Sequence, residues 1–283
     1  MQDEWVDFCS EGLTADQLAE RIFTGRIVVF ERLPAMNQLV EATRGLLDGI
    51  FDGLSPASAF RNIGVDAYRA RMKQARAEFR KDADIGRLYR DAIIAAGADP
   101  KTTFIDKLSL RNAPPFEADY SHSFGALPPH RDSWGAGLDC QINWWLPFFE
   151  LTAGRTMAIF PYSWDRPIAN DSGFWDHRRA VNEPGYPALP SAQEPVDWSK
   201  GLYITVPPGA LVAFSASHLH ATVPNRTDTA RISSDARTVD LAHLLTGRGA
   251  PNVDRGDVAP GLDWFRHIGS GDRLREVMLA REN

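Results

Sequence analysis

The chain has 283 residues, of which 43% are hydrophobic and 24% charged, proportions of a globular protein that exclude a disordered or collagen-like chain. A formal net charge of −6 argues against a dedicated nucleic-acid-binding protein, and two cysteines are too few for a disulfide framework. With no recognisable signal peptide and no apolar run long enough to span a membrane, we expect a soluble cytoplasmic protein that binds neither nucleic acid nor membranes.

The first hundred residues are predicted to be mainly helical. Thr14 and Gln17 form a capping-box pattern, and Leu18 and Ile22 follow at helical spacing. Further helical patterns cover residues 36–51, 65–81 and 85–97, with a short β-branched strand at residues 27–30. Basic residues between 69 and 81 interleave with acidic ones, which indicates a solvated helix face rather than a nucleic-acid-binding one.

After Pro100 the pattern changes to short strands. We predict a strand from Thr102 to Leu110, followed by strands at residues 138–147, 155–160, 202–206, 210–214, 219–223 and 231–239. Residues 161–200 form a long insertion, with one short helix near 172–181, and insertions of this length often cover a binding site. The sequence therefore predicts an α+β fold, a β-sandwich with helices packed outside it.

A His-x-Asp triplet is the first motif with chemical meaning. In an extended segment, His130 and Asp132 point to the same face with their Cα atoms ~7 Å apart, so both can reach one metal ion. Alone the triplet is weak, because a surface ion pair is an equally ordinary explanation. His122, eight residues earlier, is expected to face solvent or substrate rather than to bind a metal.

A second cluster strengthens the metal interpretation. His218 and His220 lie on the same side of a predicted strand, so their spacing leaves both open as ligands. Two histidines and one carboxylate form the facial triad of non-haem Fe(II) oxygenases, which leaves three coordination positions open. On the next strand Arg231, Ser233 and Arg237 share a face, where an arginine can bind a carboxylate through two parallel hydrogen bonds.

Together these residues resemble the Fe(II)- and 2-oxoglutarate-dependent oxygenases, in particular their phytanoyl-CoA-dioxygenase-like branch. The resemblance rests on His130-x-Asp132, on His220, and on the Arg231-x-Ser233 motif that begins eleven positions after His220. That distance favours His220 over His218 as the ligand. The segment after His-x-Asp departs from the branch pattern, with Gly154–Met157 and Phe160–Trp164 in place of its usual elements.

The resemblance implies a fold and a domain organisation. It implies one oxygenase domain over residues 1–283, with a double-stranded β-helix (jelly-roll) core at residues 101–240. Residues 1–100 would be its helical support and residues 241–283 a C-terminal extension.

The resemblance also implies a reaction and its site. The cofactor would be Fe(II), held by His130, Asp132 and His220, with 2-oxoglutarate and O2 as co-substrates and succinate and CO2 as products. We expect 2-oxoglutarate to be held by Arg231, Ser233 and Lys107.

Strand alternation gives the expected substrate contacts. The side chains that should face the chamber are Gln141, Asn143, Trp145, Arg111 and Arg237. Trp134 and the segment Tyr162–Trp164 should add aromatic walls. So many cationic and amide groups favour hydroxylation of a small polar, anionic metabolite. A cupin-like protein that binds a metal or sugar without oxidising anything is the alternative, but it gives Arg231-x-Ser233 no role.

Overall fold

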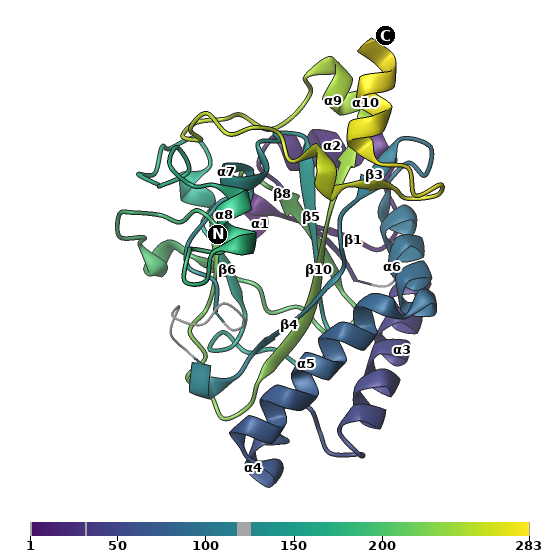
Figure 1. The fold of residues 1–283 in the computed structure, drawn as a ribbon, viewed down its shortest axis with the longest axis vertical. Helices are drawn as coiled ribbons and strands as arrows, with labels where there is room; N and C mark the ends of the chain where they lie inside the picture. The colour runs from purple at the N-terminus through teal and green to yellow at the C-terminus, as the bar shows by residue number, and fades with distance from the viewer. Residues whose placement is uncertain (1, 32, 118–125, 283) are drawn as a thin grey trace.

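The computed structural model describes residues 2–31, 33–117 and 126–282 (Figure 1). Its helices are α1 (Gln2–Trp5), α2 (Ala15–Phe23), α3 (Pro34–Ile50), α4 (Phe60–Ile63), α5 (Val65–Lys81), α6 (Ala83–Ala96), α7 (Ser133–Ala136), α8 (His177–Asn182), α9 (Leu241–Thr246) and α10 (Leu274–Glu282). Its strands are β1 (Val6–Cys9), β2 (Ile27–Phe30), β3 (Thr103–Ile105), β4 (Ser109–Ala113), β5 (Gln141–Pro147), β6 (Met157–Ile159), β7 (Leu202–Tyr203), β8 (Leu211–Ser215), β9 (His220–Thr222), β10 (Arg231–Asp240) and β11 (Arg266–His267).

Over the described residues, the strands form a large sheet and a small one. The large sheet has the order β1-β2-β8-β5-β10-β3-β11, with β4 also paired to β10, and the small sheet has the order β7-β6-β9. All pairings are antiparallel except the one between β1 and β2. The strand β10 is the organising element, since β5 pairs along one edge and β3 and β4 pair in succession along the other.

Helices α3, α5 and α6 cover one face of the large sheet (Figure 1). Side-chain caps fix the start of two helices: Asp82 accepts a hydrogen bond from the Ile85 backbone N–H at the start of α6, and Thr14 forms the predicted capping box of α2. From α5, Tyr68, Met72 and Phe79 pack into the core against the sheet. Burying each of these large side chains contributes about 1.5–3 kcal/mol to folding.

The other face of the large sheet contributes to the candidate site. Along β5, Ile142, Trp144 and Leu146 join the core beneath the helices, whereas Trp145 packs with residues of the small sheet. This alternation is the one predicted for the strand. The α+β prediction is therefore confirmed at the level of helices packed on a mainly antiparallel sheet.

Two local predictions differ from the structure. Residues 6–9, unassigned in the sequence, form β1 and extend the sheet beside β2. The strand predicted from Thr102 to Leu110 is instead two strands, β3 and β4. The chain leaves the sheet between them, because the Asp106 carboxylate accepts a hydrogen bond from the Arg237 backbone N–H at 2.7 Å and strand pairing resumes only at Ser109.

The basic residues of α5 contact the rest of the fold. Arg69 pairs with Glu117 and Arg71 with Asp52, each at 2.7 Å. Within the described residues, no helix is both long and apolar enough to cross a membrane.

Candidate metal centre

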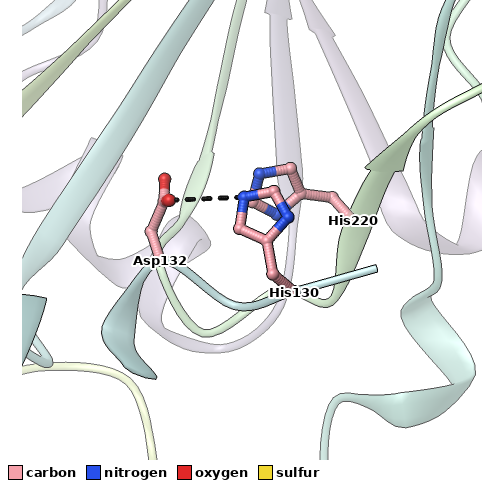
Figure 2. Close-up of side chains that lie close together, drawn as sticks. All are labelled: His130, Asp132 and His220. Carbon is pink, nitrogen blue, oxygen red and sulfur yellow. Dashed lines mark ion pairs between the residues drawn. The ribbon is translucent and has the colours of Figure 1, made fainter. Parts of the chain in front are cut away.

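His130, Asp132 and His220 converge on one point (Figure 2). Their potential ligand atoms all lie within 4.8 Å of one another, and His130 Nε2 lies 3.5 Å from Asp132 Oδ1. Ligands bound at about 2.1 Å and at right angles to each other lie about 3 Å apart, so a small closure brings these atoms to metal distance. The prediction that the whole triplet is extended is wrong, because Asp132 has helical dihedrals and precedes α7.

Backbone pairing places the two histidines side by side. The backbone N–H of each donates to the carbonyl of the other, at 3.0 Å from His130 and 2.9 Å from His220. Their ring centroids lie 4.2 Å apart. This bridge joins the segment before α7 to β9, so residues 90 positions apart in the chain share one site.

Hydrogen bonds fix which nitrogen of each ring faces the site. His130 Nδ1 lies 2.7 Å from the carbonyl oxygen of Pro128, and His220 Nδ1 lies 3.0 Å from that of His218. A carbonyl oxygen only accepts, so both Nδ1 atoms carry the proton and both Nε2 atoms present a lone pair. Two lone pairs and a carboxylate facing one another repel unless a cation binds between them, and carbonyl-bonded Nδ1 is the usual support of a metal-binding histidine.

The electrostatics suit a cation. Burial and the neighbouring His130 lower the pKa of His220 to about 4, so this imidazole is neutral at pH 7. Burial acts to raise the pKa of Asp132, but His130, His220 and Arg237 outweigh it and hold that pKa below its ordinary value. Neutral imidazoles and an ionised carboxylate are the forms that bind a divalent metal.

His218 has a structural role. Its Nε2 lies 3.1 Å from the carbonyl oxygen of Gly25, and its Nδ1 accepts the backbone N–H of Ser215 at 3.2 Å. Both ring nitrogens are thus occupied, and the ring packs against Trp164. The choice that the i, i+2 spacing left open is decided by these bonds in favour of His220.

This buried histidine gives a pH prediction. Burial lowers the pKa of His218 to about 3, whereas an unfolded histidine titrates near 6.5. Between these values the unfolded chain binds the proton and the folded one does not, so the free energy of unfolding falls as the pH drops from about 6.5 towards 3. The slope from this group is at most about 1.4 kcal/mol per pH unit.

Urea unfolding of the metal-free protein at pH 7.5, 6 and 5 measures that slope. His218→Gln should show a shallower dependence than the wild type, since His220 contributes equally to both proteins. Equal slopes would mean that His218 does not remain neutral in the fold.

An inner chamber of about 70 Å³ lies against the triad, between the sheets. Besides His130, Asp132 and His220, its walls include Arg231, Arg111, Arg237, Asn143, Trp145, Met157 and Phe214. Of the predicted contact residues, Arg231, Arg111, Arg237, Asn143 and Trp145 thus line it.

Arg231 is the unusual group in this chamber. Its side chain is buried, its Nη1 donates to the Thr156 carbonyl at 3.1 Å, and its Nε has no hydrogen-bond partner among the described residues. Burial and the nearby Arg111 lower its pKa to about 10, so it stays charged at pH 7. No ion pair to Arg231 is found in the described part of the chain. A buried cation without a carboxylate is costly, and an anionic ligand would satisfy it.

Two further buried donors in this region lack partners. Ser233 lies two residues after Arg231 on β10, and its hydroxyl has no hydrogen bond among the described residues. Asn143 accepts from Gln141 at 2.9 Å, which leaves its own amide nitrogen free in the same part of the structure.

Arg111 and Arg237, by contrast, each form an ion pair with a carboxylate. Arg111 pairs with Asp235 at 2.7 Å, and Arg237 pairs with Asp106 at 2.6 Å. Burial raises the pKa of Asp106 to about 6 despite Arg237, which leaves it ionised at pH 7. These pairs remove the basis for expecting an anionic substrate.

Several predicted contacts lie elsewhere. Trp134 is fully buried in a separate apolar cluster, where its indole N–H donates to Asp254 at 2.6 Å, because the chain turns into α7 after His130. Tyr162 packs at that cluster and Trp164 on His218, so neither forms the expected aromatic wall. Lys107 lies outside the inner chamber, since the break at Asp106 interrupts the alternation. Gln141 reaches the chamber only through Asn143. His122 lies outside the described residues.

The structure also shows residues that the sequence did not single out. Arg131, between two candidate ligands, is 1% exposed and pairs with Asp254 of the C-terminal extension at 3.0 Å. Its other nitrogens donate to the carbonyls of Ser217, Ser163 and Arg166. The sequence did offer a sign of Arg131, because this arginine stands between two candidate ligands without an explanation of its own. Nothing in the sequence pointed to Asp254.

No family model and no curated protein matches this sequence. Solved structures with a similar outline include the apo form of ThoJ, described as a non-heme monooxygenase (18% identity, 86% of each chain, TM-score 0.48). EvdO2 from Micromonospora carbonacea var. aurantiaca, complexed with 2-oxoglutarate, is 13% identical over 81% of this chain and 92% of its own (TM-score 0.45). SnoN, a non-heme alpha ketoglutarate dependent epimerase from nogalamycin biosynthesis, is 17% identical over 90% and 95% (TM-score 0.42). Similarities this low assign no activity, so the side-chain geometry must do so.

Proposed function

We propose that this chain is a 2-oxoglutarate-dependent non-haem iron dioxygenase. The observation that carries the proposal is a buried arginine without an acidic partner, Arg231, in the same chamber as the convergence of His130, Asp132 and His220. A metal-binding protein needs the triad alone. A metal enzyme with an anionic co-substrate needs the triad and also a buried cation that binds the anion.

The residues fit Fe(II). Two neutral imidazole nitrogens and one carboxylate oxygen, grouped on one side, leave three positions of an octahedral ion open. When bound, Fe(II) with 2-oxoglutarate would activate O2, the oxidant, which takes two electrons from 2-oxoglutarate to give succinate and CO2 and two from the substrate to give the oxidised product. Hydroxylation is the reaction that we propose, and a double-stranded β-helix within a single domain is the fold in which we propose it occurs.

The chain's own residues would then bind and orient 2-oxoglutarate. Arg231 would hold the distal carboxylate of 2-oxoglutarate through its planar guanidinium, and the Ser233 hydroxyl, which has no hydrogen-bond partner among the described residues, would support it. The ring centroid of Trp145 lies 5.9 Å from the Arg231 guanidinium carbon, a cation–π contact that favours the charged group, and the indole would help to exclude water. Asn143 offers its free amide N–H to the chamber.

Anaerobic loading with Fe(II) followed by 2-oxoglutarate tests the class. We expect the weak visible charge-transfer band of the chelate, and succinate when oxygen is admitted. A protein that binds the metal but gives neither band nor succinate would instead be the cupin-like binder.

Arg231→Lys tests the co-substrate site. Lysine keeps the charge but loses the planar fork, so the affinity for 2-oxoglutarate should fall by roughly tenfold or more, at ~1.4 kcal/mol per decade, with Fe(II) affinity little changed. Titration of the charge-transfer band measures both. Arg44→Lys is the matched control, since Arg44 also donates to a backbone carbonyl, that of Phe148, but lies outside the chamber. Unchanged affinity in Arg231→Lys would remove Arg231 from the site.

A further inference from the structure

A larger outer pocket also borders the triad, and Arg231 is not among the residues that line it. Its volume is about 500 Å³, and it shares His130, Asp132 and Arg237 with the inner chamber. Ligand pockets for small molecules usually have about 300–1,000 Å³, a range that includes the outer pocket. A substrate in this pocket would reach the metal site directly.

Three aromatic rings form one wall of the outer pocket. The ring centroids of Trp175 and His177 lie 6.0 Å apart, and those of His177 and Trp264 lie 4.7 Å apart. The Trp175 indole N–H donates to the Pro187 carbonyl at 2.9 Å, which fixes this ring. Partial burial lowers the pKa of His177, which favours the neutral ring that packs against Trp264. The wall joins the long insertion to the C-terminal extension.

The long insertion also contributes four apolar residues to the pocket. Val181, Ala188, Leu189 and Pro190 line it from the same insertion. Val181 is 68% exposed, and an exposed β-branched side chain facing a pocket gains by contact with an apolar ligand.

The charges in the pocket walls are largely paired. Asp106 pairs with Arg237, Asp263 with Arg275, and Arg131 with Asp254. Among the described residues that line the pocket, Lys107 is the lysine or arginine for which no ion pair is found. The pocket therefore combines its aromatic and aliphatic wall with charges that are mostly paired, apart from Lys107.

We propose that the outer pocket binds a substrate with a flat ring system, which lies against Trp175, His177 and Trp264 and presents a ring atom or substituent to the metal site. The role as substrate rests on the proposed function, whereas the ring-binding site rests on the pocket alone. This assignment replaces the small polar metabolite expected from Arg111 and Arg237, because both arginines are neutralised.

Binding of simple probes to the metal-free protein tests the site without any turnover. Equilibrium dialysis would compare 2-naphthol, a flat bicyclic ring, with 1-octanol, a flexible chain bearing the same hydroxyl group, and with malate, a small polar diacid. We expect 2-naphthol to bind at least tenfold more tightly than either. Trp175→Ala and Trp264→Ala should each weaken its binding by about threefold to tenfold, because ring stacking adds to simple burial.

Trp198→Ala is the matched control, since Trp198 packs on Phe160 outside the pocket and its loss should leave 2-naphthol binding unchanged. Circular dichroism and thermal unfolding would confirm that each variant folds. Tighter binding of 1-octanol or malate than of 2-naphthol would overturn the proposal. It would also be overturned if 2-naphthol bound equally well to the wild type and to both tryptophan variants.

The charge-transfer experiment separates this inference from the proposed function. Ring binding without the 2-oxoglutarate band would leave the ring site standing and remove the oxygenase. The band without ring binding would leave the oxygenase and remove the ring site.

Discussion

Replacing His130, Asp132 or His220 by alanine is expected to weaken Fe(II) binding at least a hundredfold, whereas His218→Gln should retain it. Each of the three side chains offers one donor atom to the same point, so each variant loses a third of the protein ligands. Changes in groups that merely support ligands already cost about 10–100-fold in affinity, and loss of a ligand should cost more. Anaerobic equilibrium dialysis with Fe(II) measures the affinities.

Thermal unfolding gives an independent readout of the same prediction. A ligand that binds only the folded state stabilises it by about 2.7 kcal/mol at a hundred times its Kd. Fe(II) should therefore raise the Tm of the wild type and of His218→Gln, and should leave the three alanine variants unchanged. Retained binding in His220→Ala together with lost binding in His218→Gln would reverse the assignment of the distal ligand.

The sequence was most informative where the direction of a side chain depends on a single strand. Alternation along residues 141–147 correctly separated Trp145 from Trp144, because side chains in a strand point to opposite faces whatever the neighbouring strands do. The three candidate ligands were found through motif and spacing, and the structure brings them together.

Sequence reasoning was least informative where two distant segments meet. The pairing of Arg111 with Asp235 joins residues 124 positions apart and depends on the register between β4 and β10. Strand register follows from pairing partners that a single sequence does not reveal. The same limit hid Trp264 and Asp254, which reach the site only because the C-terminal extension folds back over α7. Gly137, at φ 65°, shows how close this approach is, since a Cβ there would meet the Val258 carbonyl oxygen at 2.8 Å.

The buried pair of Arg131 and Asp254 is the second place where a large effect is expected. Asp254 accepts three hydrogen bonds, from the Arg131 guanidinium at 3.0 Å, the Trp134 indole at 2.6 Å and the Ile168 backbone at 3.1 Å. Arg131→Met leaves this carboxylate buried without its cation and frees the carbonyls that the guanidinium holds. Removing one partner of a buried ion pair typically costs 3–5 kcal/mol, so the free energy of unfolding should fall by about that much.

Asp254→Asn, and the double variant with Arg131→Met, complete a double-mutant cycle. The double variant should be less destabilised than the sum of the two single ones, because no buried charge is left unpaired in it. Arg179→Met is the control: Arg179 pairs with Glu183 at a comparable 2.8 Å, but on the exposed surface of α8, where such pairs add little. Urea unfolding of the metal-free proteins measures all four.

Arg131 should also influence the metal site, since it lies between His130 and Asp132 and binds the carbonyl of Ser217, three residues before His220. By fixing the backbone on both sides of the triad, it holds the donor atoms close together before any ion arrives. We therefore expect Arg131→Met, measured at a temperature where it is fully folded, to bind Fe(II) about 10–100-fold more weakly than the wild type. Arg131→Lys, which keeps the charge of the pair but has fewer donors, should recover stability more than metal affinity. Unaltered Fe(II) affinity in a folded Arg131→Met protein would show that the pair stabilises the fold without positioning the ligands.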